Sequence, residues 1–237
     1  MPYRKQQFVN NEIYHIVLRG IDDNLIFKNT DDYYRGIFSL YEFNTAKSIT
    51  IQRKREFRAR LKRENRDLIS VIDERDKLVE VLAFCFMPNH IHLLLRQIKD
   101  GGITKFMLKI GAGYGGYFNR KYNRKGHVFQ NRFLAVLIKD DNQLKTIFTY
   151  IHTNPISFRE PNWKEKGIGN PEETIKFLEN YKWSSYLDYI NIKNFPSVIE
   201  KKFFTDVIGG EKGCKEFIIN WVYYKKEIRE PFKIFLE

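Results

Sequence analysis

Two apolar, β-rich runs with only three residues between them constrain the fold of this chain most strongly. Leu78–Phe86 is followed closely by His90–Gln97, and the pair predicts an antiparallel hairpin. Because side chains alternate across a strand, His90 and His92 are expected on one face and Ile91 on the other. Two imidazoles presented together are a typical part of a divalent metal site.

Two ligands do not complete a metal site, and paired strand histidines are more often surface or hydrogen-bonded polar groups. A second segment, Tyr150–Pro155, strengthens the metal interpretation. In a helix Tyr150 and Asn154 are four residues apart and share one face. The phenol can act as a nucleophile toward phosphorus, and the Asn154 amide oxygen can supply a third ligand. For Tyr150 taken alone, a core or surface tyrosine is the commoner interpretation.

The order of the predicted elements indicates an α+β fold. Strands are expected at Glu12–Gly20, in the two runs of the hairpin, and at Phe133–Ile138. Helices are expected from a cap at Asp31 or Asp32 to Phe43, at Thr104–Tyr122, and at Asn142–Thr153 with a cap at Asp140 or Asp141. The resulting βαββαβ order resembles the ferredoxin-like arrangement, an antiparallel sheet with helices packed on one face, here followed by the helix that carries Tyr150.

The charge of the chain favours a polyanionic partner. Its 237 residues include 41 Lys and Arg against 29 Asp and Glu, a formal net charge of +12. Each phosphate that such a surface neutralises releases counterions, which drives binding. The two cysteines, Cys85 and Cys214, make no disulfide framework or zinc motif and fit a reducing, cytoplasmic location. We find no signal peptide and no apolar run long enough to span a membrane.

Two segments fall outside the ferredoxin-like unit. An insertion at about 45–77 contains the basic run Arg53–Arg66, which predicts a charged helix or hairpin, with a solvated face and a nucleic-acid arm about equally favoured. The tail contains two apolar-periodic stretches, Ser197–Ile208 and Glu211–Lys225, which predict helices. We therefore expect a main domain at 1–190, with the insertion, and a helical C-terminal extension at 191–237.

Several motifs together resemble one known group. Phe86–Leu94 resembles the His-hydrophobic-His signature of single-stranded-DNA tyrosine transposases (the HUH, IS200-like superfamily), and more narrowly the REP-associated tyrosine transposases. Four further segments resemble that group's first strand, central helix and loop, catalytic helix and C-terminal marker: Tyr14–Ile16 with Arg19–Gly20, Tyr114–Asn119 followed by Gly126–Phe133, Tyr150–Pro155 and Trp183–Tyr186. The resemblance covers residues 3–44 and 78–190.

The resemblance implies a metal-dependent enzyme that cleaves and rejoins single-stranded DNA near short hairpins. His90, His92 and Asn154 would hold Mg²⁺ or Mn²⁺, and Tyr150 would attack a DNA phosphate. The products would be a 5′-phosphotyrosyl enzyme and a free 3′-hydroxyl, with no requirement for ATP. The group also implies a REP-like hairpin partner, a cytoplasmic, nucleoid-associated location and a monomer or homodimer, with Tyr150 serving its own histidine pair or a partner's. The candidates for gripping DNA are Arg19, Arg120, Lys121, Arg124, His127, Gln130 and Arg132.

Other residues compete for these roles. Tyr114 and Tyr117 are rival nucleophiles, but four residues later the chain offers them only Phe118 and Lys121, which are poor metal ligands. His15 is expected to pack at the sheet rather than to bind metal. His152 is expected to point away from the face that carries Tyr150.

Three other functions compete with this one. The first is a catalytically silent or domesticated hairpin-binding protein of the same fold. The second is a replication-initiator or relaxase-type nuclease, which tends to carry further domains; no Gly-x4-Gly-Lys-Ser/Thr loop occurs here. The third is an RNA-binding ferredoxin-like module, for which the sequence shows no suitable pattern of sheet aromatics and which leaves the histidine pair unexplained.

Overall fold

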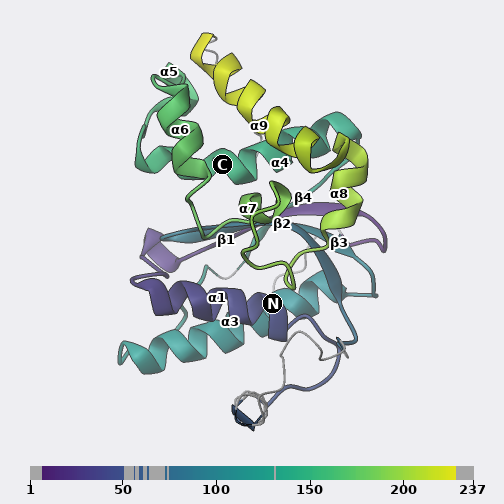
Figure 1. Ribbon diagram of the computed structural model, residues 1–237. Coiled ribbons are helices and arrows are strands. Elements are labelled where there is room, and N and C mark those ends of the chain that lie inside the picture. Colours follow the sequence, from purple (N-terminus) through teal and green to yellow (C-terminus); the bar gives the residue numbers. More distant parts are fainter. Residues whose placement is uncertain are drawn as a thin grey trace.

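The computed structural model describes residues 7–50, 56, 59–60, 63, 73, 75–130 and 132–227. A four-stranded antiparallel sheet lies at its centre, with strand order β2-β3-β1-β4. The strands are β1 (Ile13–Arg19), β2 (Val79–Met87), β3 (His90–Gln97) and β4 (Leu134–Leu137). Helices cover both faces of this sheet (Figure 1). The expected α+β, ferredoxin-like βαββαβ order is confirmed.

The predicted hairpin is present. β2 pairs with β3 in antiparallel register, from Met87 opposite His90 to Val79 opposite Gln97. β3 also pairs with β1, and β1 pairs with β4, so β3 and β1 are the central strands. Because both central strands are covered by helices, their side chains are buried on either face.

One face of the sheet is covered by α1 (Thr30–Glu42) and α3 (Gly102–Lys121). The apolar residues of this layer include Ile37, Leu40, Phe106 and Ile110, which pack on the sheet in one cluster. The predicted cap of α1 is wrong by two or three residues. Asn29 is the N-cap, because its side chain accepts a hydrogen bond from the backbone N–H of Asp32.

The glycines of α3 have different reasons for being there. A Cβ on Gly113 would lie 2.1 Å from the ring of Phe43, so close packing of the segment after α1 against α3 requires glycine. Gly111 faces open space. Close packing therefore accounts for the glycine at position 113.

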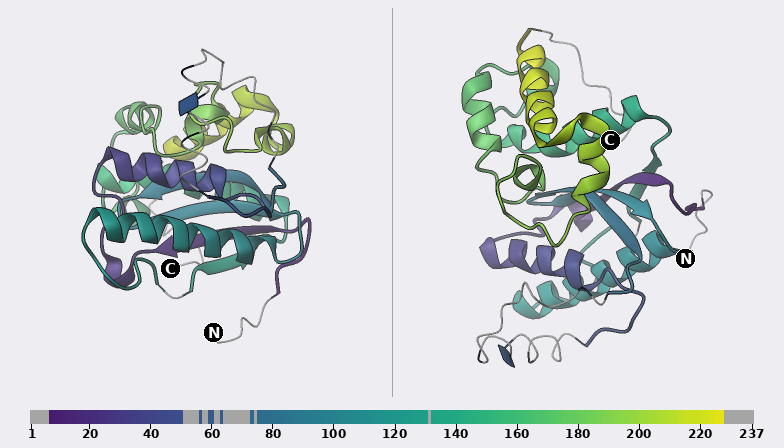
Figure 2. Two further views of the ribbon diagram at one scale, coloured as in Figure 1. Left: turned by 90° about the horizontal axis from the view of Figure 1, so that it is seen from below. Right: turned by 45° about the vertical axis from the view of Figure 1, so that its right-hand side comes forward.

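The other face of the sheet is covered by α4 (Asp141–Thr153) and by elements that follow it (Figure 2). The Asp140 side chain accepts a hydrogen bond from the backbone N–H of Gln143, which confirms one of the two predicted caps. α4 contacts β2 and β3. Its residues Leu144, Ile147, Phe148 and Ile151 bury into a second apolar cluster.

The segment between α4 and the tail contains helices that the periodicity does not predict. They are η3 (Asn154–Phe158), α5 (Trp163–Lys166), α6 (Pro171–Leu178) and α7 (Tyr186–Tyr189). Three of them have five residues or fewer, too short to show a helical period. Before α7 the chain runs beside β2, where the backbone N–H of Ser185 donates to the Phe84 carbonyl.

The tail forms α8 (Lys201–Ile208) and α9 (Gly210–Glu227), so the two predicted helices are present with α8 starting later than expected. Gly209, which lies between the two predicted stretches, has φ +85° and ends α8. Phe204 of α8 and Ile218 of α9 join the same apolar cluster as α4. The boundary at 190 stays a prediction.

The basic run Arg53–Arg66 lies almost entirely outside the described residues, so its predicted helix or hairpin is not described. Among the residues that are described, no helix is long and apolar enough to cross a membrane.

Candidate active site

His90 and His92 lie on the face of the sheet that α4 covers. Their neighbour Ile91 points into the opposite apolar cluster, with α1 and α3. The two imidazole rings are 4.8 Å apart, centroid to centroid, and nearly perpendicular. The alternation predicted from the sequence therefore places both histidines on one face.

Each histidine of the pair has a partner for its Nδ1 atom. His90 Nδ1 lies 2.7 Å from Asn89 Oδ1, which can only accept, so this nitrogen of His90 carries the proton. His92 Nδ1 lies 3.0 Å from His15 Nε2. If His92 also carries its proton on Nδ1, both Nε2 atoms present lone pairs, the arrangement that metal-binding histidines use.

α4 brings Tyr150 and Asn154 to the same place. Asn154, the residue that ends α4, places its Nδ2 atom 3.1 Å from His92 Nε2, and this amide can donate to the lone pair there. A half-turn of the amide would exchange Nδ2 for Oδ1 at the same position. The Tyr150 ring lies 5.3 Å from the His92 ring and 6.1 Å from the His15 ring.

Burial favours the neutral form of His15 and His92. Burial lowers the pKa of His92 well below its ordinary value, and the nearby His15, His90, Lys164 and Arg19 lower it further. Burial likewise lowers the pKa of His15 to about 3. Neutral imidazoles are the form that binds metal, and the cationic side chains around them suit an approaching phosphate.

The described residues fit a metal ion held by two imidazoles and an amide oxygen. No group of three or more His, Cys, Asp or Glu side chains among them could hold one. The atoms that could hold a metal ion here are His90 Nε2, His92 Nε2 and Asn154 Oδ1, with substrate oxygens completing the coordination. Such a mixed nitrogen and oxygen set is compatible with Mg²⁺ or Mn²⁺.

The site is closed to solvent at its centre. Tyr150 and His92 are each 1% exposed and Asn154 is 4% exposed. His90 is half-buried, at the start of β3. The Tyr150 side chain is therefore not accessible from solvent in this structure.

Sequence reasoning missed Lys164. Its Nζ atom lies 3.3 Å from the Tyr150 hydroxyl and 5.0 Å from the centroid of the Tyr150 ring. Lys164 is 14 residues from Tyr150 and lies on the short helix α5, so no helical spacing connects the two. In the sequence, Lys164 is one of several basic residues between Arg159 and Lys166, and nothing distinguishes it from the others.

The rival residues lie elsewhere. The Tyr114 hydroxyl donates to the backbone carbonyl of Ile26, and burial raises its pKa. The Tyr117 hydroxyl donates to Asp32 Oδ1 at 3.0 Å, so both tyrosines lie on the α1 and α3 side of the sheet. His152 is buried on the other side of α4 from Tyr150, with its Nε2 atom 2.7 Å from Ser185 Oγ.

The DNA-binding candidates divide into three sets. Arg19 is paired with His90 across β1 and β3, so its side chain lies on the histidine face at the same end of the sheet. Lys121 is engaged within the fold, with its Nζ atom 2.8 Å from Asp32 Oδ1 and 2.9 Å from Asn29 Oδ1. The remaining candidates lie near the end of α3 and along the loop after it; Arg120, His127, Gln130 and Arg132 are exposed and Arg124 is half-buried.

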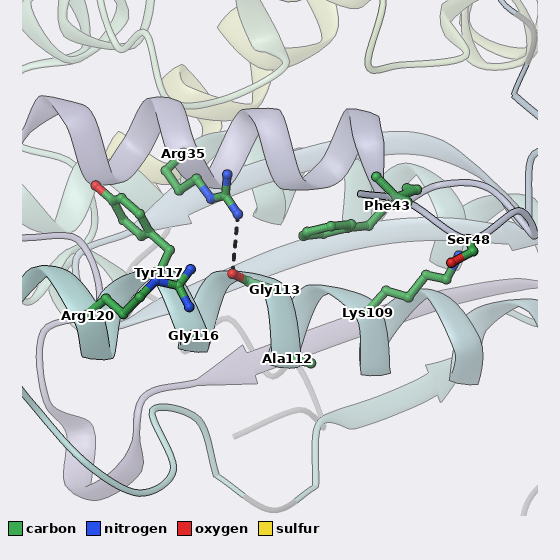
Figure 3. Close-up of a pocket in the computed structure, with 10 residues that line it drawn as sticks. Arg35, Phe43, Ser48, Lys109, Ala112, Gly113, Gly116, Tyr117 and Arg120 are labelled. Atoms are coloured by element: carbon green, nitrogen blue, oxygen red, sulfur yellow. Dashed lines mark hydrogen bonds between the residues drawn. The ribbon is translucent and has the colours of Figure 1, made fainter. Parts of the chain in front are cut away.

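A cavity of about 480 Å³ lies away from the histidines, between α1 and α3. Figure 3 shows Arg35, Lys109 and Arg120 around it, with Arg35 donating to the Gly113 carbonyl. It is on the opposite face of the sheet from His92 and Tyr150, so it is not the candidate active site.

One family matches part of the chain. Residues 47–154 match the family described as "Transposase IS200 like". A protein of Haemophilus influenzae named as a REP-associated tyrosine transposase is 30% identical over 87 residues, which are 32% of this chain and 49% of that protein. The chain thus spans about half the length of this curated relative.

A solved structure of a REP-associated tyrosine transposase bound to a REP hairpin is also similar, with a TM-score of 0.43 and 12% identity over 83% of this chain and 90% of that one. The family match begins inside the insertion at 45–77 and contains His90, His92, Tyr150 and Asn154. The resemblance predicted from the sequence is confirmed, because residues 47–154 are similar to the IS200-like transposase family and the curated relative is named as a REP-associated tyrosine transposase.

Proposed function

We propose that this protein is a metal-dependent endonuclease and strand transferase that acts on single-stranded DNA near hairpins. Tyr150 is the nucleophile, and His90, His92 and Asn154 are the metal ligands. The observation that carries the proposal is the convergence of a strand and a helix on one point. Asn154 Nδ2 lies 3.1 Å from His92 Nε2, and the Tyr150 ring lies 5.3 Å from the His92 ring.

In the reaction, the Tyr150 oxygen forms a bond to a DNA phosphorus, and the bond from that phosphorus to the 3′ oxygen breaks. The strand downstream is then held through its 5′ phosphate, and the strand upstream leaves with a 3′-hydroxyl. Attack of a 3′-hydroxyl on the phosphotyrosine reverses the step and joins strands. The energy of the phosphodiester is kept in the covalent intermediate, so no nucleotide cofactor is needed.

The metal would be held by the Nε2 atoms of His90 and His92 and the Oδ1 atom of Asn154. When bound, Mg²⁺ or Mn²⁺ would polarise the scissile phosphate and stabilise charge on the leaving oxygen. His15 and Asn89 would keep the two imidazoles in the required tautomer, through their contacts with Nδ1 of His92 and of His90.

The DNA partner would be single-stranded DNA that contains a REP-like hairpin. Support comes from the net charge of +12 and from the name of the Haemophilus relative. We assign the grip on DNA to Arg19 beside His90 and to the exposed side chains of Arg120, His127, Gln130 and Arg132. A reaction on chromosomal DNA fits a cytoplasmic, nucleoid-associated location, in a monomer or a homodimer.

The test is a covalent adduct. The full chain is incubated with a pool of labelled single-stranded hairpins with randomised flanks, in Mn²⁺, Mg²⁺ or EDTA, and denaturing gels report protein-linked DNA. We expect an adduct with metal, none in EDTA, and none for Tyr150→Phe. Tyr224→Phe, which changes an exposed tyrosine far from the site in sequence, is the matched control and should behave as wild type.

Two results would contradict the assignment. An adduct that persists in Tyr150→Phe and disappears in Tyr114→Phe would move the nucleophile to the other face of the sheet. An adduct through a 3′ phosphate, read from which end of the captured DNA stays labelled, would reverse the proposed polarity.

A catalytically silent hairpin-binding protein is the second candidate function. The observation in its favour is the closed site, in which Tyr150 is only 1% exposed. That function predicts tight hairpin binding with no adduct under any metal condition, so the same experiment separates the two.

A further inference from the structure

We propose that Lys164 is a further catalytic residue, which stabilises the negative charge of the Tyr150 oxygen during both cleavage and rejoining, and that the C-terminal helix α9 holds it in place. This inference rests on the proposed function of Tyr150. It is carried by contacts around α5, a four-residue helix that neither the motifs nor the periodicity of the sequence indicates.

The Lys164 ammonium group is placed at the reacting atom. Its Nζ atom is 3.3 Å from the Tyr150 hydroxyl, within reach of a hydrogen bond, and 5.0 Å from the ring centroid. Tyr150 is almost fully buried, whereas Lys164 is half-buried. A cation beside a buried oxygen is screened less than one at the surface, so it acts strongly on charge that develops there.

α5 is fixed from the side of the C-terminal extension. Trp163, the residue before Lys164, is 1% exposed, and its ring lies 5.4 Å from that of Trp221 on α9. At the other end of α5, the backbone N–H of Ile168 donates to the Lys225 carbonyl at 3.1 Å. α9 therefore contacts the chain on both sides of Lys164, and these contacts fix the position of the lysine beside Tyr150.

The chemical step balances without a further reactant. The phenol proton passes to water, and the phenolate lone pair forms the bond to phosphorus. The bond from phosphorus to the 3′ oxygen breaks, its electron pair remains on that oxygen, and water supplies a proton there. Lys164 keeps its proton throughout, and in the reverse step it stabilises the same phenolate as the leaving group.

The first arm of the test measures the rate of adduct formation at saturating hairpin DNA. Lys164→Met should lower this rate by about 10²-fold, the loss usual for one electrostatic contact to a developing charge. The rate of release by an added 3′-hydroxyl strand should fall by a similar factor. Lys164→Arg should restore most of both rates, and Lys166→Met, an exposed lysine of the same helix, should match wild type.

The second arm needs no DNA and no metal. In protein labelled with 3-fluorotyrosine, the ¹⁹F resonance that is missing from Tyr150→Phe reports Tyr150. That resonance should titrate at a pH higher by about one unit or more in Lys164→Met than in wild type or Lys164→Arg, because a nearby cation favours the phenolate. Trp221→Ala, which loosens α5, should shift the resonance in the same direction by a smaller amount.

The arms separate failure of this inference from failure of the proposed function. If wild type forms an adduct but Lys164→Met keeps its rate and its ¹⁹F titration, Lys164 has no catalytic role. If Lys164→Met weakens hairpin affinity and keeps the rate at saturation, Lys164 is a DNA contact, which overturns the inference. If wild type forms no adduct, the proposed function and the catalytic role both fail, and the titration decides whether Lys164 stabilises the phenolate at all.

Discussion

The two faces of the central sheet are built from the same strands but from different chemistry. On the face that α1 and α3 cover, Ile91, Leu93 and Leu95 of β3 join a continuous apolar cluster. On the face that α4 covers, β3 presents His90, His92 and Leu94, and β1 adds the buried His15. Along β3 the first face is apolar, whereas the second face combines an apolar cluster with histidines, an amide and a phenol.

One strand thus contributes to stability through one face and to the candidate active site through the other. Successive residues of β3 have different physical requirements. Apolar side chains stabilise the fold when they are buried, whereas buried polar groups must be hydrogen-bonded. The polar face meets part of that requirement internally, because His15 and Asn154 both contact His92, although His15 Nδ1 has no hydrogen-bond partner among the described residues. Adjacent residues of β3 should therefore fail in different ways when they are changed.

The largest expected effect is on activity, from the histidine face. His92→Ala removes a proposed ligand and should lower adduct formation by at least about 10³-fold, since the metal-stabilised transition state is lost. The measurement is the initial rate of adduct formation under Mn²⁺, with circular dichroism as the check on folding. If the His92→Ala protein is folded and reacts at the wild-type rate, the histidine face is not required for the reaction.

The next effect is on stability, from the apolar face. Leu93 lies beside His92 in the sequence and is fully buried. The substitution Leu93→Ala should lower the unfolding free energy by about 2–5 kcal/mol, because it leaves a cavity. Urea denaturation measures this cost. The fraction that stays folded should keep its rate of adduct formation, and a rate lost beyond the loss of folded protein would show that the faces are coupled.

Acid should weaken the two faces in different pH windows. Burial lowers the pKa of His15 and of His152 to about 3, so both are neutral when folded and gain protons on unfolding below their ordinary value. Stability of the metal-free protein should thus fall as pH drops below about 6.5, by about 2 kcal/mol for each histidine between pH 7 and pH 5. In His152→Gln, the unfolding free energy should fall less steeply between pH 7 and pH 5, by the contribution of one histidine. Urea denaturation at several pH values measures this dependence.

Asp32, on the α1 and α3 side, responds in a lower window. Burial raises its pKa, but hydrogen bonds from Lys121, Tyr122, the Lys28 N–H and Tyr117 outweigh burial and leave the pKa below its ordinary value. Its contribution to stability is therefore present above about pH 4 and is lost as pH falls further. In Asp32→Asn, the pH dependence of the unfolding free energy should be unchanged between pH 5 and pH 7. Below pH 4 the unfolding free energy should depend less on pH than in wild type.

The smallest expected effect concerns DNA contacts outside both faces. Arg132→Ala removes an exposed cation, so hairpin affinity should weaken modestly and the slope of log Kd against log salt should fall by about 0.7, the value for one phosphate on a single strand. Lys121→Ala instead breaks contacts to Asp32, so it should destabilise the protein. Fluorescence anisotropy over a salt series and thermal melting distinguish the two, and the opposite pattern would exchange their roles.

The sequence predicted the elements with strong periodicity and missed those without it. The hairpin of β2 and β3, the β1 strand and the helices α1, α3 and α4 all have repeating apolar positions, which determine local structure. The helices α5 and α7 have four residues each, and their positions depend on contacts with α9 and β2 that no local pattern encodes.

The candidate site divides in the same way. By itself, the sequence determined that His90 and His92 share a face and that Tyr150 and Asn154 share another, because the periods of a strand and of a helix are fixed by backbone geometry. Only the tertiary structure decided that these two faces meet, that His15 hydrogen-bonds to His92, and that Lys164 contacts the Tyr150 hydroxyl. Those contacts join residues from 14 to 77 positions apart, and their geometry depends on how helices pack across the sheet, which local periodicity does not specify.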